Sequence, residues 1–386
     1  MVKKILINGI TLDQAILVAL LSKIRVWQYS GYEITIFGNK LLKNRIDALN
    51  IIQNYKYIEL KKTRRINNVV YFMFEALKRN LLAISYLKKF KNRYDVIYSI
   101  SSVLDLILLP YIVKKTDEKV KWVTVFDNTV PFNRPGNKFI CCLAWLFFRI
   151  SLLLLKKADK IFVISDELKK YLINKNFNKK KLIVTGNGIQ GDLIKKAKKC
   201  DKYNIDALFV GRINEAKGIY DLLKVIEIIK KKFSNFQLAI MGDGDTNTIQ
   251  KFKNKIDVMK LQNNIQFLGY KLGIEKFNII KSSKCFIFLS HDESFGIALL
   301  EAVCCGIPCL AYDLEEYKEI YKKKEVIVFK KGDYQSIAKK IIEIFENKSF
   351  ENKKGQLLLK RYNWEAITRI EMNAIETVCR IKNEII

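Results

Sequence analysis

The feature that most constrains the fold is a regular alternation of short apolar runs with segments of helical length. In the first half the runs are ILING (5–9), YEITIF (32–37), YDVIYSIS (94–101), VKWVTVF (120–126), KIFVIS (160–165) and KLIVTGN (181–187). In the second half they are DALFVG (206–211), FQLAIMG (236–242), IQFLGY (265–270), CFIFLS (285–290), PCLAYD (308–313) and VIVF (326–329). Such runs are nearly all apolar and rich in β-branched residues, which is typical of strands covered by helices on both faces. The alternation therefore predicts right-handed βαβ units and parallel sheets.

Two such series predict two domains, because 386 residues are too many for one ordinary core. We expect an α/β fold with a first Rossmann-like domain over residues 1–188 and a second over 189–362. A terminal helix over 363–386 is expected to cross back to the first domain. We expect the two parallel sheets to face each other across a cleft. Doubly wound sheets bind ligands at the carboxyl ends of their strands, so the loops there are the expected binding site.

Cysteine and histidine usage argues against metal and disulfide chemistry. The chain has eight cysteines without a C-x-x-C pair, and its single histidine is His291. Most of the cysteines lie in apolar segments, as reduced and buried thiols of a cytosolic protein do. A zinc site is therefore not expected.

Positive charge is concentrated in the first half of the chain. Residues 1–200 hold 38 Lys and Arg against 14 Asp and Glu, whereas residues 201–386 hold 31 against 25. A basic half-molecule attracts nucleic acid or anionic lipid headgroups. No nucleic-acid-binding motif accompanies the charge, so nucleic acid is not an expected partner. Compositional drift raises Lys everywhere and does not explain the asymmetry.

Two segments of the first half favour a membrane surface. FICCLAWLFFRISLLLL (139–155) has one charge, Arg149, and only reaches the lower limit of transmembrane length. We interpret it as a buried or interfacial helix, with a true span as the alternative. Residues 60–93 place the clusters KKTRR and KKFKNR around an apolar helical stretch. That pattern suits an anionic leaflet, and a packed helix with a solvated Lys-rich face explains it equally well.

The first candidate binding segment is VGRINEAKGIYDLL (210–223). Gly211 and Arg212 end a predicted strand, and Lys217 with Gly218 opens the next helix. The two cations suit a diphosphate, because Arg can contact two oxygens in a fork and Lys supplies a point charge. Solvated surface cations are an equally simple interpretation.

The second candidate segment is SHDESFGIALLEAVCCGIP (290–308). A helix is expected to begin at Phe295, Gly296 and Ile297, where a glycine admits a close ligand and unpaired N–H groups favour a phosphate. Carboxylates this close would repel a phosphate, so Glu293 and Glu301 are expected to bind sugar hydroxyls. A capped amphipathic helix explains either acid alone but not the whole string.

The string ESFGIALLEA, with VGR and KG upstream, resembles the retaining glycosyltransferases of family 4, which have the GT-B fold. MGDGD (241–245), FLGY (267–270), NGI (187–189) and the terminal NW helix follow the family's order, so the resemblance spans nearly the whole chain and is tightest over 206–313. It implies that the second domain binds a nucleotide-sugar, UDP-linked in preference to GDP-linked, and that the first binds the acceptor. No cofactor or metal ion is implied.

Carried over by position, the resemblance implies a role for each site residue. Arg212 and Lys217 neutralise the departing diphosphate, Glu293 contacts the donor sugar, and Glu301 binds the ribose. Further donor contacts are implied for the following positions: Gly9, Gly211, Gly269, Phe295, Gly296 and Ile297.

The chain departs from the family at one position of the first domain. Where such enzymes commonly have a histidine in a string like TVHD, VTVFDN has Phe126, followed by Asp127. An aromatic ring cannot accept a proton, so Asp127 or a substrate group is expected to take that role. His291 belongs to the donor domain, and we interpret it as a loop residue without a catalytic part.

We therefore expect a cytoplasmic glycosyltransferase, peripheral to the inner face of the cell membrane. It would transfer a hexosyl group with retention to a lipid-linked or cell-surface glycan acceptor. Two alternatives remain: a phosphorylase or epimerase on a similar fold, and a GT-B-like protein that binds nucleotide-sugar without turnover.

Overall fold

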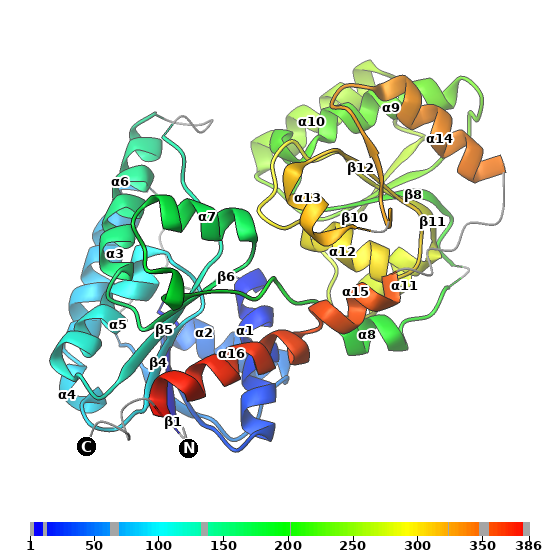
Figure 1. Ribbon diagram of the computed structural model, residues 1–386. Coiled ribbons are helices and arrows are strands. Elements are labelled where there is room, and N and C mark those ends of the chain that lie inside the picture. Colours follow the sequence, from blue (N-terminus) through cyan, green and yellow to red (C-terminus); the bar gives the residue numbers. More distant parts are fainter. Residues whose placement is uncertain are drawn as a thin grey trace. The chain divides into compact units, whose positions relative to one another are not determined.

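The computed structural model describes residues 4–10, 14–61, 69–132, 138–200, 202–322, 324–346 and 355–380. The chain forms two compact units, residues 1–187 with 364–386 and residues 188–363. Each unit contains one parallel sheet with helices on both faces (Figure 1). The prediction of two parallel-sheet α/β domains is confirmed.

The first unit contains a seven-stranded sheet in the order β3-β2-β1-β4-β5-β6-β7. Its strands are β1 (Lys4–Asn8), β2 (Glu33–Gly38), β3 (Lys56–Glu59), β4 (Val96–Ser99), β5 (Lys121–Phe126), β6 (Lys160–Val163) and β7 (Leu182–Val184). All neighbouring strands are parallel. Chain order changes direction between β1 and β4, and loops at such a switch point form the binding crevice of doubly wound sheets.

Helices cover both faces of this sheet. They are α1 (Gln14–Tyr29), α2 (Lys40–Leu49), α3 (Val69–Ile84), α4 (Leu87–Phe90), α5 (Leu104–Thr116), α6 (Lys138–Leu155), α7 (Asp166–Asn174), the 3-10 helix η1 (Lys179–Lys181) and α16 (Trp364–Arg380). Both α3 and α6 pack on α5, whereas α16 packs on α1 (Figure 1). The last helix of the chain is thus part of the first unit.

A buried ion pair attaches α16 to the first unit. Lys23 Nζ of α1 lies 2.5 Å from Glu371 Oε1 of α16, and the two side chains are only 4% and 0% exposed. The Tyr98 hydroxyl of β4 donates to Glu371 Oε2 at 3.0 Å, and Lys23 Nζ donates to the Tyr98 oxygen at 2.9 Å. These three groups satisfy one another in a region that water does not reach, as buried charges must be satisfied.

The second unit contains a six-stranded sheet in the order β10-β9-β8-β11-β12-β13. Its strands are β8 (Ile205–Val210), β9 (Leu238–Met241), β10 (Ile265–Gly269), β11 (Ser283–Phe288), β12 (Cys309–Tyr312) and β13 (Ile327–Phe329). Its helices are α8 (Gly191–Lys196), the 3-10 helix η2 (Glu215–Lys217), α9 (Ile219–Lys230), α10 (Thr246–Val258), α11 (Gly273–Ser282), α12 (Ile297–Cys304), α13 (Glu315–Ile320), α14 (Tyr334–Glu346) and α15 (Gly355–Tyr362). The switch point lies between the adjacent strands β8 and β11.

Three cysteines of the second unit, Cys285, Cys304 and Cys309, are buried, as predicted for structural thiols, whereas Cys200 and Cys305 are partly exposed. Cys285 on β11 and Cys309 on β12 are each about 1% exposed. Burial raises the pKa of Cys285 to about 12, so this thiol stays protonated at neutral pH. Not every cysteine follows the prediction, because Cys142 on α6 is exposed.

Helix α6 matches the apolar segment that the sequence singles out. Among the described residues, it alone is long and apolar enough to cross a membrane, yet only 28% of it is buried. Its inner face packs on α5. The apolar segment is therefore not a fully buried core helix: five of its 18 residues are buried and eight are exposed. Of the basic cluster KKTRR beside α3, residues 62–65 lie outside the described residues.

Candidate functional site

Two loops at the switch point of the second unit are joined by two hydrogen bonds to one backbone carbonyl. One connects β8 to α9 through η2, and the other connects β11 to α12. The His291 N–H donates to the Ala216 carbonyl at 2.8 Å, and the Ser290 hydroxyl donates to the same oxygen at 3.2 Å. These bonds fix the loop that carries Lys217 against the loop that carries Glu293.

Gly218 is the residue that permits this close approach. It adopts the left-handed conformation with φ +70°, and a Cβ there would lie 1.9 Å from the carbonyl oxygen of Leu289. No other residue has room at this position, and the backbone conformation itself disfavours a side chain. Gly218 also precedes the first residue of α9, so the strain would pass directly to the start of that helix.

We expect Gly218→Ala to lower both stability and activity. The left-handed backbone alone costs a non-glycine residue about 1–2 kcal/mol, and the overlap with Leu289 adds to that cost. Thermal unfolding measures the loss, and Gly332→Ala is the matched control. Gly332 has φ +85°, but no atom lies within 4 Å of its added Cβ. Equal losses in the two variants would show that the contact with Leu289 is unimportant.

The joined loops bring Lys217 and Glu293 into contact. Lys217 Nζ lies 2.5 Å from Glu293 Oε1, and their side chains are 24% and 10% exposed. Sequence analysis identifies both residues as site candidates, but it does not predict that they pair. A bound diphosphate would compete with Glu293 for the ammonium group, which would release the carboxylate to accept hydrogen bonds from sugar hydroxyls.

The start of α12 forms a second part of the site. Gly296 precedes the helix in the left-handed conformation, φ +74°, and its Cβ position lies 2.9 Å from the Tyr317 ring. Ile297, the first helical residue, is 38% exposed, whereas Phe295 is buried against Tyr362 with ring centroids 5.5 Å apart. The first backbone N–H groups of a helix lack helical partners and favour an anion.

Glu301 lies one turn further along α12 and is 4% exposed. Its Oε2 atom lies 2.5 Å from Lys276 Nζ of α11. The buried carboxylate is therefore held in one position by a cation that the sequence does not single out. A carboxylate fixed in this way can accept two hydrogen bonds from the neighbouring hydroxyls of a ribose.

The carboxyl ends of β8, β9 and β10 are joined through glycines. The Gly211 N–H donates to the Met241 carbonyl, and the Gly242 N–H donates to the Gly269 carbonyl, both at 3.0 Å. A Cβ on Gly242 would lie 1.8 Å from the Gly211 oxygen. Arg212 follows Gly211 and is exposed. Gly211, Arg212 and Gly269 therefore lie at the same carboxyl edge of the sheet as Lys217 and Glu293.

Asp221 of α9 joins three further elements of the second unit. Its carboxylate accepts hydrogen bonds from the Tyr312 hydroxyl at 2.9 Å and the Tyr334 hydroxyl at 2.8 Å. His291 Nε2 lies 2.9 Å from Asp221 Oδ2. Sequence reasoning missed Asp221, since a lone acid in an apolar helix carries no motif. His291 is a loop residue, as interpreted, and it ties the loop of Glu293 to α9.

Asp127 and Gly9 belong to the first unit, at the carboxyl ends of β5 and β1. The Ser101 hydroxyl, after β4, donates to Asp127 Oδ1 at 2.9 Å. Burial raises the pKa of the Asp127 carboxyl above its ordinary value, and the hydroxyls of Ser101 and Ser102 oppose that rise. The Gly9 N–H donates to the Phe37 carbonyl at 2.8 Å. The structure thus places these two predicted residues in the first unit and the other nine in the second.

Phe126 points into the core of the first unit. Its side chain is 0% exposed and stacks on Tyr171 of α7, with ring centroids 6.3 Å apart and an interplanar angle of 13°. The phenylalanine at the position of the family's histidine is therefore a packing residue. Asp127, the next residue, is the titratable group at this strand end.

Metal ligands do not converge in the part of the chain that the structure describes. No three His, Cys, Asp or Glu side chains there form a group that could hold a metal ion. The cations in the switch-point loops of the second unit are Arg212 and Lys217.

Comparison with known proteins agrees with this geometry. The family model described as "Glycosyl transferases group 1" matches residues 190–357. An uncharacterized glycosyltransferase of Methanocaldococcus jannaschii is 26% identical over 361 residues, covering 87% of each chain. A phosphatidyl-myo-inositol mannosyltransferase of Mycobacterium tuberculosis is 27% identical over 205 residues, covering 50% of this chain and 53% of that protein.

A solved structure extends the likeness to the whole fold. Anabaena HepE, crystallised in complex with UDP and glucose, superposes with a TM-score of 0.73 at 14% identity, covering 97% of this chain and 100% of that chain. The parallel sheets of both units, the matched segment and these relatives agree with one another. Residues 190–357 therefore match the group 1 glycosyltransferase family model, and the chain has the GT-B fold.

Proposed function

We propose that this protein transfers a sugar, with retention and without a metal ion, from a UDP-sugar to a lipid-linked or cell-surface glycan acceptor at the cytoplasmic face of the membrane. The observation that carries the proposal is the contact between Lys217 and Glu293 at the switch point of the second unit. A cation for the diphosphate and a carboxylate for the sugar are thereby held within one hydrogen bond of each other.

In the donor site, cations contact the diphosphate and carboxylates contact the sugar hydroxyls. Lys217 and Arg212 stabilise the negative charge that develops on the departing diphosphate, aided by the N-terminal N–H groups of α12. These groups supply the electrostatic stabilisation that a metal ion would otherwise give. Glu301, held by Lys276, accepts hydrogen bonds from the ribose, and Glu293 contacts the transferred sugar.

The acceptor is assigned to the first unit. Asp127 lies at the carboxyl edge of that sheet, and burial raises its pKa, which is the direction that favours a general base. The mycobacterial relative is named for a lipid acceptor, and HepE was solved with UDP and glucose. The first name supports the choice of a lipid-linked acceptor, and the second supports the choice of a UDP-linked donor.

A second candidate function is binding of nucleotide-sugar without turnover. The observation that favours it is Phe126, which fills the core where the family commonly has a histidine. Under this alternative the second unit binds donor normally, and the first unit does not activate an acceptor hydroxyl. The two functions differ in whether Asp127 activates an acceptor hydroxyl.

Radiolabelled UDP-sugars incubated with a membrane lipid extract test the proposal. We expect label to enter the lipid fraction with one UDP-sugar, and Asp127→Asn to reduce that transfer while leaving UDP binding unchanged. Donor binding without transfer to any lipid or glycan fraction would favour the binding protein. Release of free sugar 1-phosphate or an epimerised nucleotide-sugar would instead indicate a phosphorylase or an epimerase.

A further inference from the structure

Helix α6 presents an apolar stripe to solvent. Phe139, Leu146 and Leu153 recur at intervals of seven residues on its outer face and are 64%, 45% and 67% exposed. Ile150 lies beside them, 36% exposed. The stripe spans 15 residues, and Phe139 and Leu153 lie about 21 Å apart along the helix axis. The outer face of a surface helix is normally polar, whereas much of the outer face of α6 is apolar.

The residues around the stripe are those that favour a lipid interface. Lys138, Arg149, Lys156 and Lys157 are exposed at its ends and edge. The Arg149 guanidinium lies 5.6 Å from the centroid of the Trp145 ring, and Trp145 packs edge-on against the exposed Phe132 at 5.4 Å. Aromatic rings and cations around an apolar strip are enriched where protein meets lipid headgroups.

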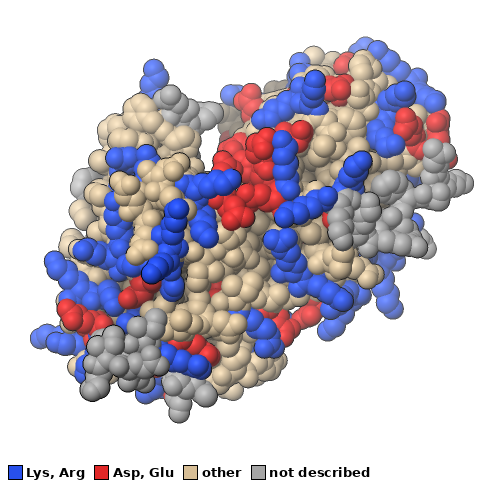
Figure 2. Space-filling view, viewed as in Figure 1, with Lys and Arg blue, Asp and Glu red and all other residues tan. Residues whose placement is uncertain are grey.

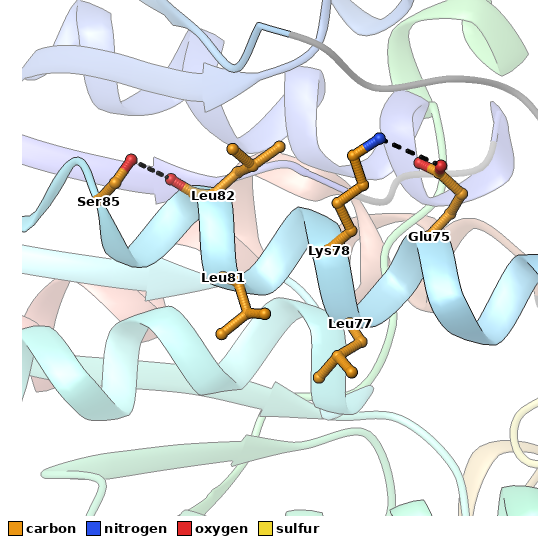
Figure 3. A pocket seen from close by; sticks show the side chains of 6 residues that line it. All are labelled: Glu75, Leu77, Lys78, Leu81, Leu82 and Ser85. Atoms are coloured by element: carbon orange, nitrogen blue, oxygen red, sulfur yellow. Dashed lines mark hydrogen bonds and ion pairs between the residues drawn. The ribbon is translucent and has the colours of Figure 1, made fainter.

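Helix α3 adds a second exposed apolar strip. Leu77 and Leu81 are 59% and 60% exposed, and they point to the same side of the helix, away from Glu75 and Lys78 (Figure 3). They line an open hollow of about 520 Å³. Because α3 and α6 both pack on α5, the two strips belong to the helical layer on one face of the sheet.

We propose that the outer faces of α6 and α3 dock on the surface of an anionic phospholipid bilayer. Electrostatic complementarity selects lipid over a protein partner, since the first 200 residues carry 38 cations against 14 anions. Figure 2 shows Lys and Arg side chains scattered over the first unit among uncharged residues. Apolar side chains enter the headgroup region, and the surrounding cations bind anionic headgroups.

Helix α6 lies on the bilayer and does not cross it. Its inner residues Phe148, Ser151 and Leu152 are buried, and the helix packs on α5. A transmembrane orientation would separate this packed face from the first unit. Surface docking leaves the packing intact and still covers Leu146 and Leu153.

The biological role of docking rests on the proposed function, because a lipid-linked acceptor lies at the membrane surface. The physical argument for it rests on the exposed residues alone. The two proposals can therefore fail separately.

Sedimentation with vesicles tests the docking surface. We expect the protein to bind vesicles of phosphatidylcholine with 30% phosphatidylglycerol at least tenfold more tightly than phosphatidylcholine alone, and added salt to weaken that binding. Leu146→Glu with Leu153→Glu should weaken it at least tenfold. Val258→Glu with Leu357→Glu is the matched control, because those side chains of the second unit are 75% and 56% exposed.

Three results would overturn the docking proposal. They are an absence of vesicle binding at low salt, equal binding by the Leu146/Leu153 variant and the wild type, and a dimer that this variant dissociates in sedimentation equilibrium. The last would identify the face as an interface between two copies of this chain. Thermal stabilisation by UDP is measured in parallel for each variant. Normal stabilisation without vesicle binding rejects the docking surface alone, and vesicle binding without stabilisation rejects the proposed donor.

Discussion

Lys217→Ala is expected to lower kcat/KM for transfer by about 10²–10³-fold, the range seen when one preorganised charge-stabilising group is removed. The ammonium group of Lys217 is held 2.5 Å from Glu293 at the switch point, where the diphosphate is proposed to leave. Its loss removes stabilisation that grows as negative charge develops on the leaving group. Most of the effect should therefore appear in kcat, with a smaller rise in KM.

The matched control for this experiment is Lys255→Ala. Lys255 is an exposed cation in the last turn of α10 of the same unit, so its removal changes the net charge equally. The control should retain activity within about twofold, since isolated surface charges contribute little. A Lys217 variant that matches the control would contradict the role of Lys217.

Lys23→Met is expected to destabilise the protein by about 3–5 kcal/mol, as removal of one partner from a buried ion pair commonly does. Among the described residues, the variant leaves the Glu371 carboxylate, 0% exposed, with the Tyr98 hydroxyl as its remaining hydrogen-bond donor. The cost arises from a charge that must be neutralised or exposed to water, and α16 should detach before the sheet unfolds. Urea unfolding monitored by circular dichroism measures the loss.

Two further variants decide the cause of this loss. Lys23→Met combined with Glu371→Leu should recover much of the stability, because no uncompensated charge remains. Arg369→Met breaks an exposed ion pair with Glu365 on the same helix, where the side chains are 66% and 62% exposed. It should cost less than about 1 kcal/mol. An equal loss in Lys23→Met and Arg369→Met would show that burial of the pair is unimportant.

Much of the fold could be predicted from the sequence because the strands of a doubly wound sheet are buried on both faces. Each apolar run was sufficient to place a strand within a few residues. The edge strand β3, KYIE, was missed because it is half exposed and begins and ends with charged residues. No apolar run distinguishes such a strand from a loop. The outward stripe of α6 was also unpredictable, since composition does not reveal which face of a helix packs.

The sequence predicts which residues form the candidate site, but it does not predict which of them are in contact. Glycine and charged residues after strands β8 and β11 identified the loops. The pairing of Lys217 with Glu293 depends on Gly218 meeting Leu289, a long-range approach that neither motif encodes. Lys276 and Asp221 were missed because neither belongs to a motif and each contacts partners at least 25 residues away in the chain. Phe126 was recognised as a departure, and only the structure places its ring in the core.

Thermal unfolding in the presence of UDP, GDP and their sugar conjugates tests the central claim most directly, namely that the second unit binds a sugar nucleotide at the switch point. A ligand that binds the folded state raises the melting temperature by mass action, without knowledge of the acceptor. We predict a rise with UDP and one UDP-sugar in the wild type, and a smaller rise in Glu301→Ala, which lacks the ribose contact. No rise with any nucleotide, or an undiminished rise in Glu301→Ala, would contradict the site described above.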